Sequence, residues 1–509
     1  ELAAALEGVS GNSTDSSSAT SRVPLTPIQH WFFEQTLPER HHWNLAKLMD
    51  VCLPDLVVDR NFKIVSHLDP ALLRQCIRAL LMHHDALRLR FKNEAHGWQQ
   101  TCAAVEMDQE VPLTVFDLTT VPVAEQASRL EALATEVQKS LDLAKGPIIR
   151  VALFNLGAQQ PQKLLIVIHH LAVDIVSWQI ILSDLQTAYQ QLMKGEQIQL
   201  LSKTTAFKAW AEQLSAYAQS QKAQQERGYW LGRPWNSVRR LPVDHPAGVN
   251  AEVSARTVST SLSTEETRVL LQDLPKFYRV QVKDVLLTAL VQAFAHWAGT
   301  STLHVDLEGH GREDLWEGVD LSRTVGWFTA IAPTCLDLTG IARPEDALKS
   351  VKEQLRAMPY GGIGFGILRY LSHDEGIKRQ LAALPRAEVV FNYRGQSSQS
   401  LSDHEGTWLK LAQAGGGAVR SLDVNRCYLL EVNGSIDENR LHVSLTYSEN
   451  IHERETIEQV LACYTEKLRA LIQACQAPAQ ESFTPSDFPE AALSQQQLDS
   501  LMAKLNQQM

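Results

Sequence analysis

The stretch Leu164-Leu-Ile-Val-Ile168, followed directly by His169-His-Leu-Ala-Val-Asp174-Ile-Val-Ser-Trp178, decides how this chain of 509 residues is interpreted. The five apolar residues predict a short strand that is buried on both faces. Beyond them, apolar residues recur at helical spacing from Trp178 to Leu192 and end before Gly195. This pattern predicts a helix with a glycine just past its last turn. Two histidines therefore lie where a buried strand gives way to a helix.

A histidine at the end of a rigid strand can be aimed into a cleft, and its ordinary pKa of about 6.5 suits proton transfer at neutral pH. Asp174 follows His170 by four residues and can turn back to hold the loop with an ion pair. Two other interpretations stay open from these residues alone. One is a histidine pair in the core with an aspartate that caps the helix, and the other is a metal site. The metal interpretation is the weaker one, because no further ligand follows at a suitable spacing.

The rest of the chain alternates helical and strand patterns without a strict strand–helix–strand rhythm. This predicts an α+β sandwich rather than a doubly wound parallel sheet. In the first half, Leu72 to His84 carries its apolar residues on one helix face. The second half repeats the arrangement with a predicted helix from Lys283 to Trp297 and a strand from Leu303 to Leu307, which leads into Glu308-Gly-His-Gly-Arg312. Two lobes with polar residues at their strand ends would enclose a cleft.

The composition excludes several classes of protein. The chain has 47 basic and 58 acidic side chains, a net charge of −11, and no basic stripe of the kind that binds nucleic acid. Its seven cysteines form no CxxC pair and no metal-ligand spacing, so we expect reduced thiols and a cytoplasmic location. The apolar runs are far shorter than the roughly 20 residues that cross a bilayer. We therefore expect neither a nucleic-acid partner nor a membrane partner.

Six segments, in order along the chain, are similar to motifs of one known family. They are Pro24–Glu34, His169–Trp178, Glu308–Glu313, Arg323–Thr329, Pro359–Gly366 and Phe391–Gln396. Together they resemble the epimerization domains of nonribosomal peptide synthetases, a branch of the condensation-domain superfamily. Condensation domains usually carry glycine after the motif aspartate, whereas this chain has Ile175. The resemblance covers about residue 24 to about residue 473. It implies a two-lobed fold similar to chloramphenicol acetyltransferase, with a V-shaped cleft between the lobes.

The resemblance also implies which residues act. Epimerization at Cα removes one proton and returns another from the opposite face, which requires two acid/base groups; His170 and Glu308 are the candidates. Asn392 and Tyr393 are candidates to hold the thioester oxygen as it becomes an enolate. The alternative for this last pair, an asparagine that satisfies a turn and a tyrosine in the core, stays open.

Several further residues are expected to be structural. Arg312 is expected to pair with Asp174 across the two lobes and so hold His170 in place, and His169 is expected to support the same loop. The pair His83-His84 ends a predicted helix and is likewise expected to be structural. No residue is assigned to a metal.

The implied substrate is an L-aminoacyl or L-peptidyl thioester on the phosphopantetheine arm of an upstream carrier domain, which is converted to an L/D mixture. No cofactor is expected to be bound by this domain, and no lysine motif for pyridoxal phosphate is present. A condensation domain, which forms amide bonds, is the alternative: it would use the same His170 but would not explain Glu308 or the Phe391-Asn-Tyr stretch. A catalytically silent docking module is a third possibility.

The two ends of the chain predict its partners. Residues 1–22 read as a carrier-domain remnant and flexible linker, residues 23–200 as the N-terminal lobe, residues 201–475 as the C-terminal lobe, and residues 476–509 as a linker and C-terminal docking helix. Ser494 and Gln497 form a predicted capping box, and Leu498, Leu501, Met502 and Leu505 form one apolar stripe. A carrier domain and an adenylation domain are thus expected upstream in the same polypeptide, and a condensation domain of the next synthetase is expected to bind the helix.

Overall fold

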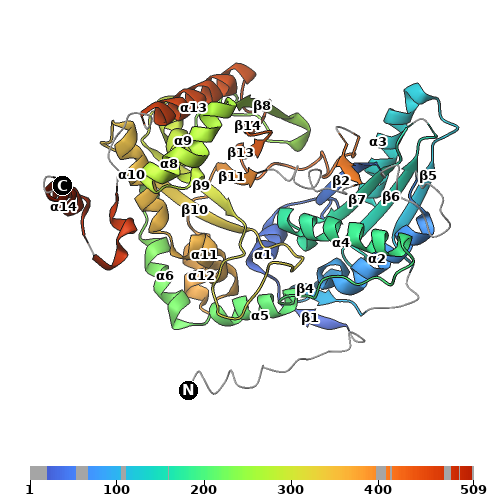
Figure 1. Ribbon diagram of the computed structural model, residues 1–509. Helices are drawn as coiled ribbons and strands as arrows, with labels where there is room; N and C mark the ends of the chain where they lie inside the picture. The colour runs from blue at the N-terminus through green and yellow to red at the C-terminus, as the bar shows by residue number, and fades with distance from the viewer. Residues whose placement is uncertain are drawn as a thin grey trace.

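Two lobes lie side by side in the computed structural model of the chain, each built on its own β-sheet (Figure 1). The structure describes residues 20–52, 67–104, 110–158, 160–396, 408–412, 415–474, 483–491 and 493–506. The predicted carrier-domain remnant falls almost wholly outside these residues. The α+β architecture expected from the sequence is confirmed.

The N-terminal lobe contains a five-stranded sheet in the order β12-β2-β7-β6-β5. Its strands are β2 (Asn44–Val51), β5 (Leu113–Asp117), β6 (Ile149–Asn155), β7 (Lys163–His169) and β12 (Leu409–Leu411). Strand β7 is the predicted buried strand and lies in the middle of the sheet. Its residues Leu165 and Val167 belong to the apolar cluster under helix α3 (Val123–Lys139), while Leu164 and Ile166 belong to the cluster on the other face. The strand is therefore buried on both faces, as its unbroken apolar run predicts.

Helices α2 (Pro70–His83) and α4 (Ile175–Met193) pack against each other on the face opposite α3. Helix α4 ends as predicted, because Gly195 just beyond it adopts φ of +77°, a conformation that favours glycine. A small sheet of order β1-β4-β3 lies beside this lobe (Figure 1). Its strands are β1 (Ser21–Val23), β3 (Leu89–Glu94) and β4 (Gly97–Cys102).

The C-terminal lobe contains a six-stranded mixed sheet in the order β10-β9-β11-β13-β14-β8. Its strands are β8 (Ala255–Ser261), β9 (Thr302–Gly309), β10 (Ala330–Asp337), β11 (Val389–Gln396), β13 (Leu430–Asp437) and β14 (Arg440–Ser448). Helices α9 (Val282–Ala298) and α13 (Arg454–Ala474) pack together over one face, where Val305 and Val389 join the core of the lobe. Alternation along a strand then directs His304, Asp306 and Glu308 to the opposite face.

The remaining helices surround this sheet and connect the lobes. They are α1 (Pro27–Glu34), α5 (Phe207–Tyr217), α6 (Gln221–Leu231), α7 (Thr264–Arg268), α8 (Leu274–Tyr278), α10 (Pro344–Arg356), α11 (Ile363–Gly366) and α12 (Glu375–Ala382). Helix α11 packs on β10 and helix α6 packs on α11 and α12, so these three cover the second face of the C-terminal sheet (Figure 1).

Segments from the second half of the sequence also form part of the N-terminal lobe. Strand β12 belongs to the second half of the sequence, yet its residues Leu409 to Leu411 pair antiparallel with Val51 to Met49 of β2. In the same way, the apolar cluster of the N-terminal lobe includes Trp210, Trp327 and Phe365 from beyond residue 200. The boundary that we placed at residue 200 is therefore crossed both by hydrogen bonds and by the core.

The C-terminal segment is fixed to its lobe by a buried ion pair. Nζ of Lys352 on α10 lies 2.7 Å from Oδ2 of Asp487, and the Lys352 side chain is almost fully buried. Helix α14 (Gln495–Asn506) follows, and the predicted capping box is present: the backbone N–H of Ser494 donates to Oε1 of Gln497 at 2.8 Å. The predicted apolar stripe is divided between the two environments, because Leu498 is buried while Leu501 is exposed.

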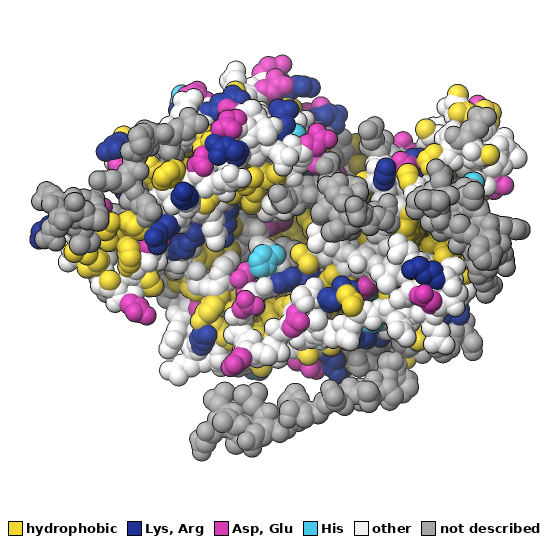
Figure 2. Space-filling model, in the orientation of Figure 1, with side chains coloured by type: hydrophobic (Ala, Val, Ile, Leu, Met, Phe, Trp, Pro, Cys, Tyr) yellow, Lys and Arg dark blue, Asp and Glu magenta, His cyan; other side chains and the backbone are white. Residues whose placement is uncertain are grey.

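In the part of the chain that the structure describes, no helix is long and apolar enough to cross a membrane. On the face shown in Figure 2, acidic and basic side chains are interspersed. That face agrees with the absence of a basic stripe in the sequence.

Candidate active site between the two lobes

His170 occupies a short 3₁₀ turn between β7 and α4. Its Nδ1 lies 2.9 Å from the carbonyl oxygen of Val173. Because a carbonyl only accepts hydrogen bonds, Nδ1 carries the proton and Nε2 is left with a free lone pair. Burial lowers the pKa of His170 to about 4, so the ring is neutral at pH 7. The imidazole is thus prepared to take a proton at Nε2.

His169 has a different environment, although it is the neighbouring residue. Its side chain is fully buried, Nε2 donates to the carbonyl oxygen of Arg40 at 2.8 Å, and Nδ1 accepts from the backbone N–H of Leu171 at 3.1 Å. Both ring nitrogens are occupied by backbone groups. The structure therefore gives His169 the surroundings of a residue that shapes the turn.

Asp174 caps the N-terminus of α4 by accepting from the backbone N–H of Ser177 at 2.7 Å. Arg312 of the other lobe donates from Nη2 to both carboxylate oxygens of Asp174 at 3.2 Å. The same guanidinium donates to the carbonyl oxygen of Thr324 at 2.9 Å and lies 3.9 Å above the ring of Phe328. The predicted contact across the lobes is therefore present and buried.

The glycines before Arg312 allow this contact to form. Gly311 adopts φ of +65°, and a Cβ at this position would lie 1.7 Å from the carbonyl oxygen of Phe328. A side chain there is thus excluded both by conformation and by space. The Glu308-Gly-His-Gly-Arg stretch turns sharply at Gly311, which brings Arg312 back toward the first lobe.

Glu308 lies near the end of β9 and is paired in register with Asn392 of the parallel strand β11. Nδ2 of Asn392 donates to Oε2 of Glu308 at 2.5 Å. Burial raises the pKa of Glu308 to about 7, and the negative charges of Glu431 and Asp306 act in the same direction. The positive charge of Arg394 opposes this shift. The carboxyl group is therefore close to half protonated at neutral pH.

Tyr393 is not brought to the same place as Asn392. Neighbouring residues of a strand point to opposite faces, and the ring of Tyr393 packs against the apolar core of the C-terminal lobe. Burial raises the pKa of its hydroxyl. A direct part for Tyr393 in the chemistry stays a prediction that this packing does not favour.

An aromatic side chain connects His170 to a cavity. The ring of Trp327 lies 4.3 Å from the ring of His170, and Trp327 also lines a cavity of about 110 Å³ between α1 and the C-terminal sheet. Asp306, two residues before Glu308 on the same face of β9, lines the same cavity. The same cavity wall thus contains Trp327, which lies beside His170, and Asp306, which lies beside Glu308 on β9.

Asp306 also belongs to this site, although no sequence motif indicates it. Its carboxyl accepts a hydrogen bond from the hydroxyl of Tyr428 at 2.8 Å, and burial raises its pKa to about 6. The signal that points to it is strand alternation, because a residue two positions before Glu308 must share its face. Tyr428 has no comparable signal, since it comes from a segment far along the chain.

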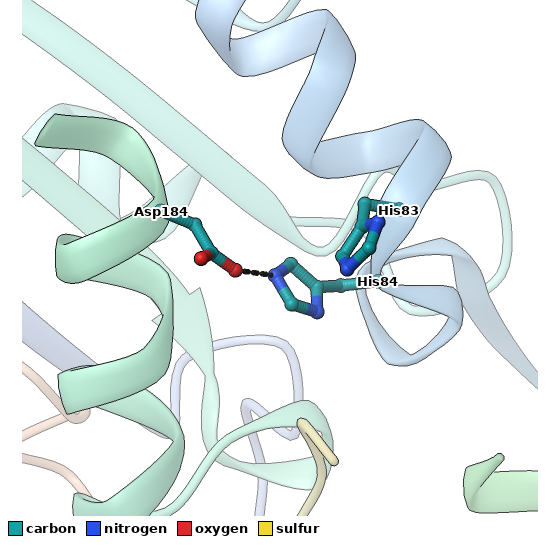
Figure 3. A group of neighbouring side chains, drawn as sticks. All are labelled: His83, His84 and Asp184. Carbon is teal, nitrogen blue, oxygen red and sulfur yellow. Dashed lines mark hydrogen bonds and ion pairs between the residues drawn. The ribbon is translucent and has the colours of Figure 1, made fainter. Parts of the chain in front are cut away.

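The side chains of His83, His84 and Asp184 form a separate group that could offer ligand atoms to a metal (Figure 3). Nε2 of His84 lies 2.9 Å from Oδ2 of Asp184, while Arg323 of the other lobe forms an ion pair with Oδ1. A metal ion would have to share that carboxylate with a guanidinium, which is unfavourable. We interpret the group as a structural link between α2, α4 and the C-terminal lobe, in agreement with the structural role expected for the two histidines.

These features define a class of protein: a two-lobed acyltransferase-like fold with a histidine motif held between the lobes. The sequence matches the family described as condensation domain over residues 19–494. The chain belongs to the condensation-domain family of nonribosomal peptide synthetases.

Relatives and solved structures agree with this assignment. The chain is 46% identical to a linear gramicidin synthase polypeptide of Brevibacillus parabrevis over 95% of its own length, and 42% identical to chondramide synthase cmdD of Chondromyces crocatus, also over 95%. It spans only 6% and 12% of those two proteins. The crystal structure of the epimerization domain from the third module of tyrocidine synthetase B is similar with a TM-score of 0.81 and 33% identity, covering 91% of this chain and all of that one.

Proposed function

We propose that this chain epimerizes an L-aminoacyl or L-peptidyl thioester at Cα, converting it to an L/D mixture while it is attached to the phosphopantetheine arm of a carrier domain. The single observation that carries the proposal is Glu308. A carboxyl group with a pKa of about 7, placed on the lobe opposite a neutral histidine, supplies the second acid/base group that epimerization requires.

The two groups are matched in protonation. Between their pKa values of about 4 and about 7, His170 and Glu308 together hold one proton, which lies mainly on Glu308. In this state one group can take the Cα proton while the other returns a proton to the opposite face. After the transfer the pair again holds one proton, so no net proton is gained or lost.

Asn392 supports this chemistry in two ways. Its amide is bonded to Oε2 of Glu308 and so orients the carboxyl group. We also propose that the amide of Asn392 donates to the thioester oxygen as it becomes an enolate, which would stabilise that charge. The thioester makes the Cα proton more acidic than an amide would, and the proposed mechanism uses no bound cofactor.

The partners follow from the same proposal. A carrier domain must deliver the thioester, and the relatives are multidomain synthetases in which such domains are expected. Helix α14 is proposed to bind a condensation domain of the next synthetase. Its exposed residue Leu501, on a helix fixed beside the lobe by the Lys352–Asp487 pair, supports this role.

Chiral analysis of a loaded carrier tests the proposal. The chain is incubated with a carrier domain that holds an L-aminoacyl thioester, and the amino acid is then released and resolved. Appearance of the D-form, with no racemization of free L-amino acid, is expected. Rapid racemization of the free amino acid, or an unchanged L-thioester, would contradict the proposal.

Amide-bond formation is the alternative for the same fold. Condensation would use His170 to assist an incoming amine. It would not explain the raised pKa of Glu308 or the contact between Glu308 and Asn392. Adding an acceptor carrier loaded with a second amino acid separates the two functions, because only condensation forms a dipeptide.

A further inference from the structure

The imidazole of His170 packs against the indole of Trp327, a residue from the second half of the sequence. The two ring centroids lie 4.3 Å apart, and the ring planes are inclined by 35°. Trp327 is only 4% exposed. A cation within about 6 Å of the centroid of an aromatic ring is attracted to the face of that ring, most strongly when the ring is tryptophan and when water is excluded. The contact therefore favours the imidazolium form of His170.

The backbone on both sides of Trp327 is fixed to the histidine motif. The backbone N–H of Gly326 donates to Oγ of Ser177 at 3.1 Å, and this hydroxyl donates to the carbonyl oxygen of Gly326 at 2.9 Å. On the other side, the backbone N–H of Phe328 donates to Oδ2 of Asp174 at 3.4 Å. Asp174 and Ser177 both follow the motif histidine within seven residues. The segment that carries the histidine thus also holds the indole against it.

Two aromatic side chains of α1 also pack on the indole. The ring of Phe32 lies 6.3 Å from that of Trp327 with the planes at 74°, and the ring of Trp31 lies 6.5 Å away with the planes at 81°. Edge-to-face arrangements of this kind are favourable for aromatic pairs. Rotation of the indole away from His170 would therefore disturb three ring contacts together.

The charged groups around His170 act on its imidazolium form in opposite directions. The carboxylate of Asp174 favours the imidazolium but is itself paired with Arg312, while the charge of Arg420 opposes it. The neighbouring His169 is neutral at pH 7, because burial lowers its pKa to about 3. Burial is also the main reason why the pKa of His170 is lowered to about 4. A buried imidazolium must nevertheless form whenever His170 takes the Cα proton.

We propose that Trp327 acts through His170: the face of its indole stabilises the imidazolium that forms when His170 takes the Cα proton, and so makes this buried histidine a stronger base. This inference rests on the proposed function. In the step, the proton passes from Cα to Nε2 of His170, and the electron pair of the broken bond goes to the enolate. Glu308 then gives its proton to the opposite face of Cα.

The presence of tryptophan at this position supports the proposal. Nε1 of Trp327 is buried and has no hydrogen-bond partner in the part of the chain that the structure describes. A buried donor without a partner lowers stability, and phenylalanine would avoid this loss. A phenyl ring, however, attracts a cation less strongly than an indole ring does. A hydrogen bond from Nε1 to the substrate is the competing explanation, and the experiments below separate the two.

Fluorinated tryptophans test the role of the ring face, because fluorine removes negative charge from the face and changes the shape of the ring little. Tryptophans with one to four ring fluorines are placed at position 327 alone in the full chain. Cα exchange on an aminoacyl carrier at pH 7 should slow with each fluorine, to about tenfold for four. Fluorine also makes the indole N–H a better donor, so an unchanged or faster exchange would overturn the proposal.

Benzothienylalanine at position 327 tests the competing explanation, since it replaces the indole N–H by sulfur and keeps the aromatic face. Exchange should stay within about threefold of the wild-type rate. A loss as large as that caused by four fluorines would assign the role to the N–H group, and the proposal would be wrong.

Trp408 provides a matched control. It is also buried, with 2% of its surface exposed, and its Nε1 likewise has no hydrogen-bond partner among the described residues. Its ring packs on the neutral side chain of Tyr189, with the centroids 5.2 Å apart. The same fluorinated residues at position 408 should leave exchange unchanged. If they slow it as much as those at position 327, fluorine acts on packing and the assignment fails.

The protonated fraction of His170 gives a second measurement that needs no substrate. Nitrogen NMR of labelled histidine reports this fraction, and the His170 signal is identified by its absence from His170→Ala. With a pKa of about 4, about one-tenth of the rings are protonated at pH 5. The fraction should fall as fluorines are added at position 327, because a less stable imidazolium has a lower pKa. A constant fraction would contradict the proposal.

The proposed function can fail separately. If the wild-type chain exchanges the Cα proton but neither measurement depends on fluorine at position 327, epimerization stands and the role of Trp327 does not. If the protonated fraction of His170 falls with fluorine but the wild-type chain exchanges no Cα proton, the contact acts as proposed and the function is wrong.

Discussion

Arg312 and Asp174 join the two lobes at the histidine motif: Nη2 of Arg312 lies 3.2 Å from each carboxylate oxygen of Asp174, and both side chains are about nine-tenths buried. Asp174 caps the helix that begins five residues after His170. The position of the histidine in the first lobe is thus determined in part by a side chain of the second.

Removing this contact should be costly. Arg312→Ala leaves the Asp174 carboxylate buried without its cation, so we expect a loss of about 3 kcal/mol in the free energy of unfolding, measured with urea. Arg312→Lys keeps the charge but loses the double contact and the stacking on Phe328, and should give an intermediate loss. Cα exchange per folded molecule should fall in both variants. Unchanged stability and exchange in Arg312→Ala would contradict this role.

Both acid/base groups should be required for proton exchange. In deuterated water, the wild-type chain should introduce deuterium at Cα of an aminoacyl carrier, whereas Glu308→Gln and His170→Ala should each be slower by about 10² to 10⁴. Asn392→Ala should slow exchange more modestly. Mass spectrometry of the released amino acid measures the label. A Glu308→Gln variant that exchanges at the wild-type rate would remove Glu308 from the mechanism and favour condensation.

The pH dependence of exchange should be bell-shaped. In the proposed mechanism, His170 and Glu308 together hold one proton, which is the main state of the pair between about pH 4 and pH 7. Below this window both groups are protonated and no base remains, and above it both have lost their protons and no acid remains. The kcat/KM for exchange should therefore fall on either side of the window. A rate that keeps rising to pH 9 would contradict the assignment.

Two neighbours of Glu308 should move the alkaline limb of that profile in opposite directions. The charge of Asp306 raises the pKa of Glu308 and that of Arg394 lowers it. Asp306→Asn should therefore shift the limb to lower pH, and Arg394→Gln should shift it to higher pH. Shifts of the same sign would show that these variants disturb packing rather than charge.

In the C-terminal segment, Asp487 is expected to stabilise the fold, whereas helix α14 is expected to serve docking. A chain that ends after Pro489 keeps Asp487 and should exchange the Cα proton normally. Loss of the buried Leu498 should lower the free energy of unfolding by at most about 2 kcal/mol. Transfer of product to a downstream synthetase should be poor. Asp487→Ala leaves Lys352 buried and unpaired, and should destabilise the chain by about 3 kcal/mol.

A second substitution makes the test of this pair specific. Replacing Lys352 by methionine in the Asp487→Ala chain removes the unpaired charge and should restore part of the lost stability. The exposed Arg343, replaced by alanine, should cost at most about 1 kcal/mol. A loss after Asp487→Ala as small as this control would show that the segment is not anchored.

Much of this arrangement could be predicted from short sequence patterns. The unbroken apolar run before His169 predicts a strand buried on both faces, and β7 lies between two apolar clusters. Glu308 and Asn392 could be named from the resemblance, but their contact could not, because it depends on two distant strands lying parallel and in register.

Long-range pairing accounts for what the sequence does not predict. Local patterns give no sign that Tyr428 meets Asp306 or that Trp327 lies against His170. The ordinary pKa of histidine suggests a group that titrates near neutral pH, whereas burial lowers the pKa of His170 to about 4 and raises that of Glu308 to about 7. Burial is a property of the assembled lobes, so these values could be known only from the structure.

Strand β12 has a consequence for engineering. Residues 409–411 complete the sheet of the first lobe, and Arg312 and Arg323 form ion pairs with Asp174 and Asp184 of the same lobe. A chimera that exchanges one lobe between related synthetases would therefore take the two sides of these contacts from different parents. Crossover points placed before residue 20 and after residue 487 keep all of these contacts together, including the Lys352–Asp487 pair. The whole two-lobed chain is then the smallest unit that recombination can move intact.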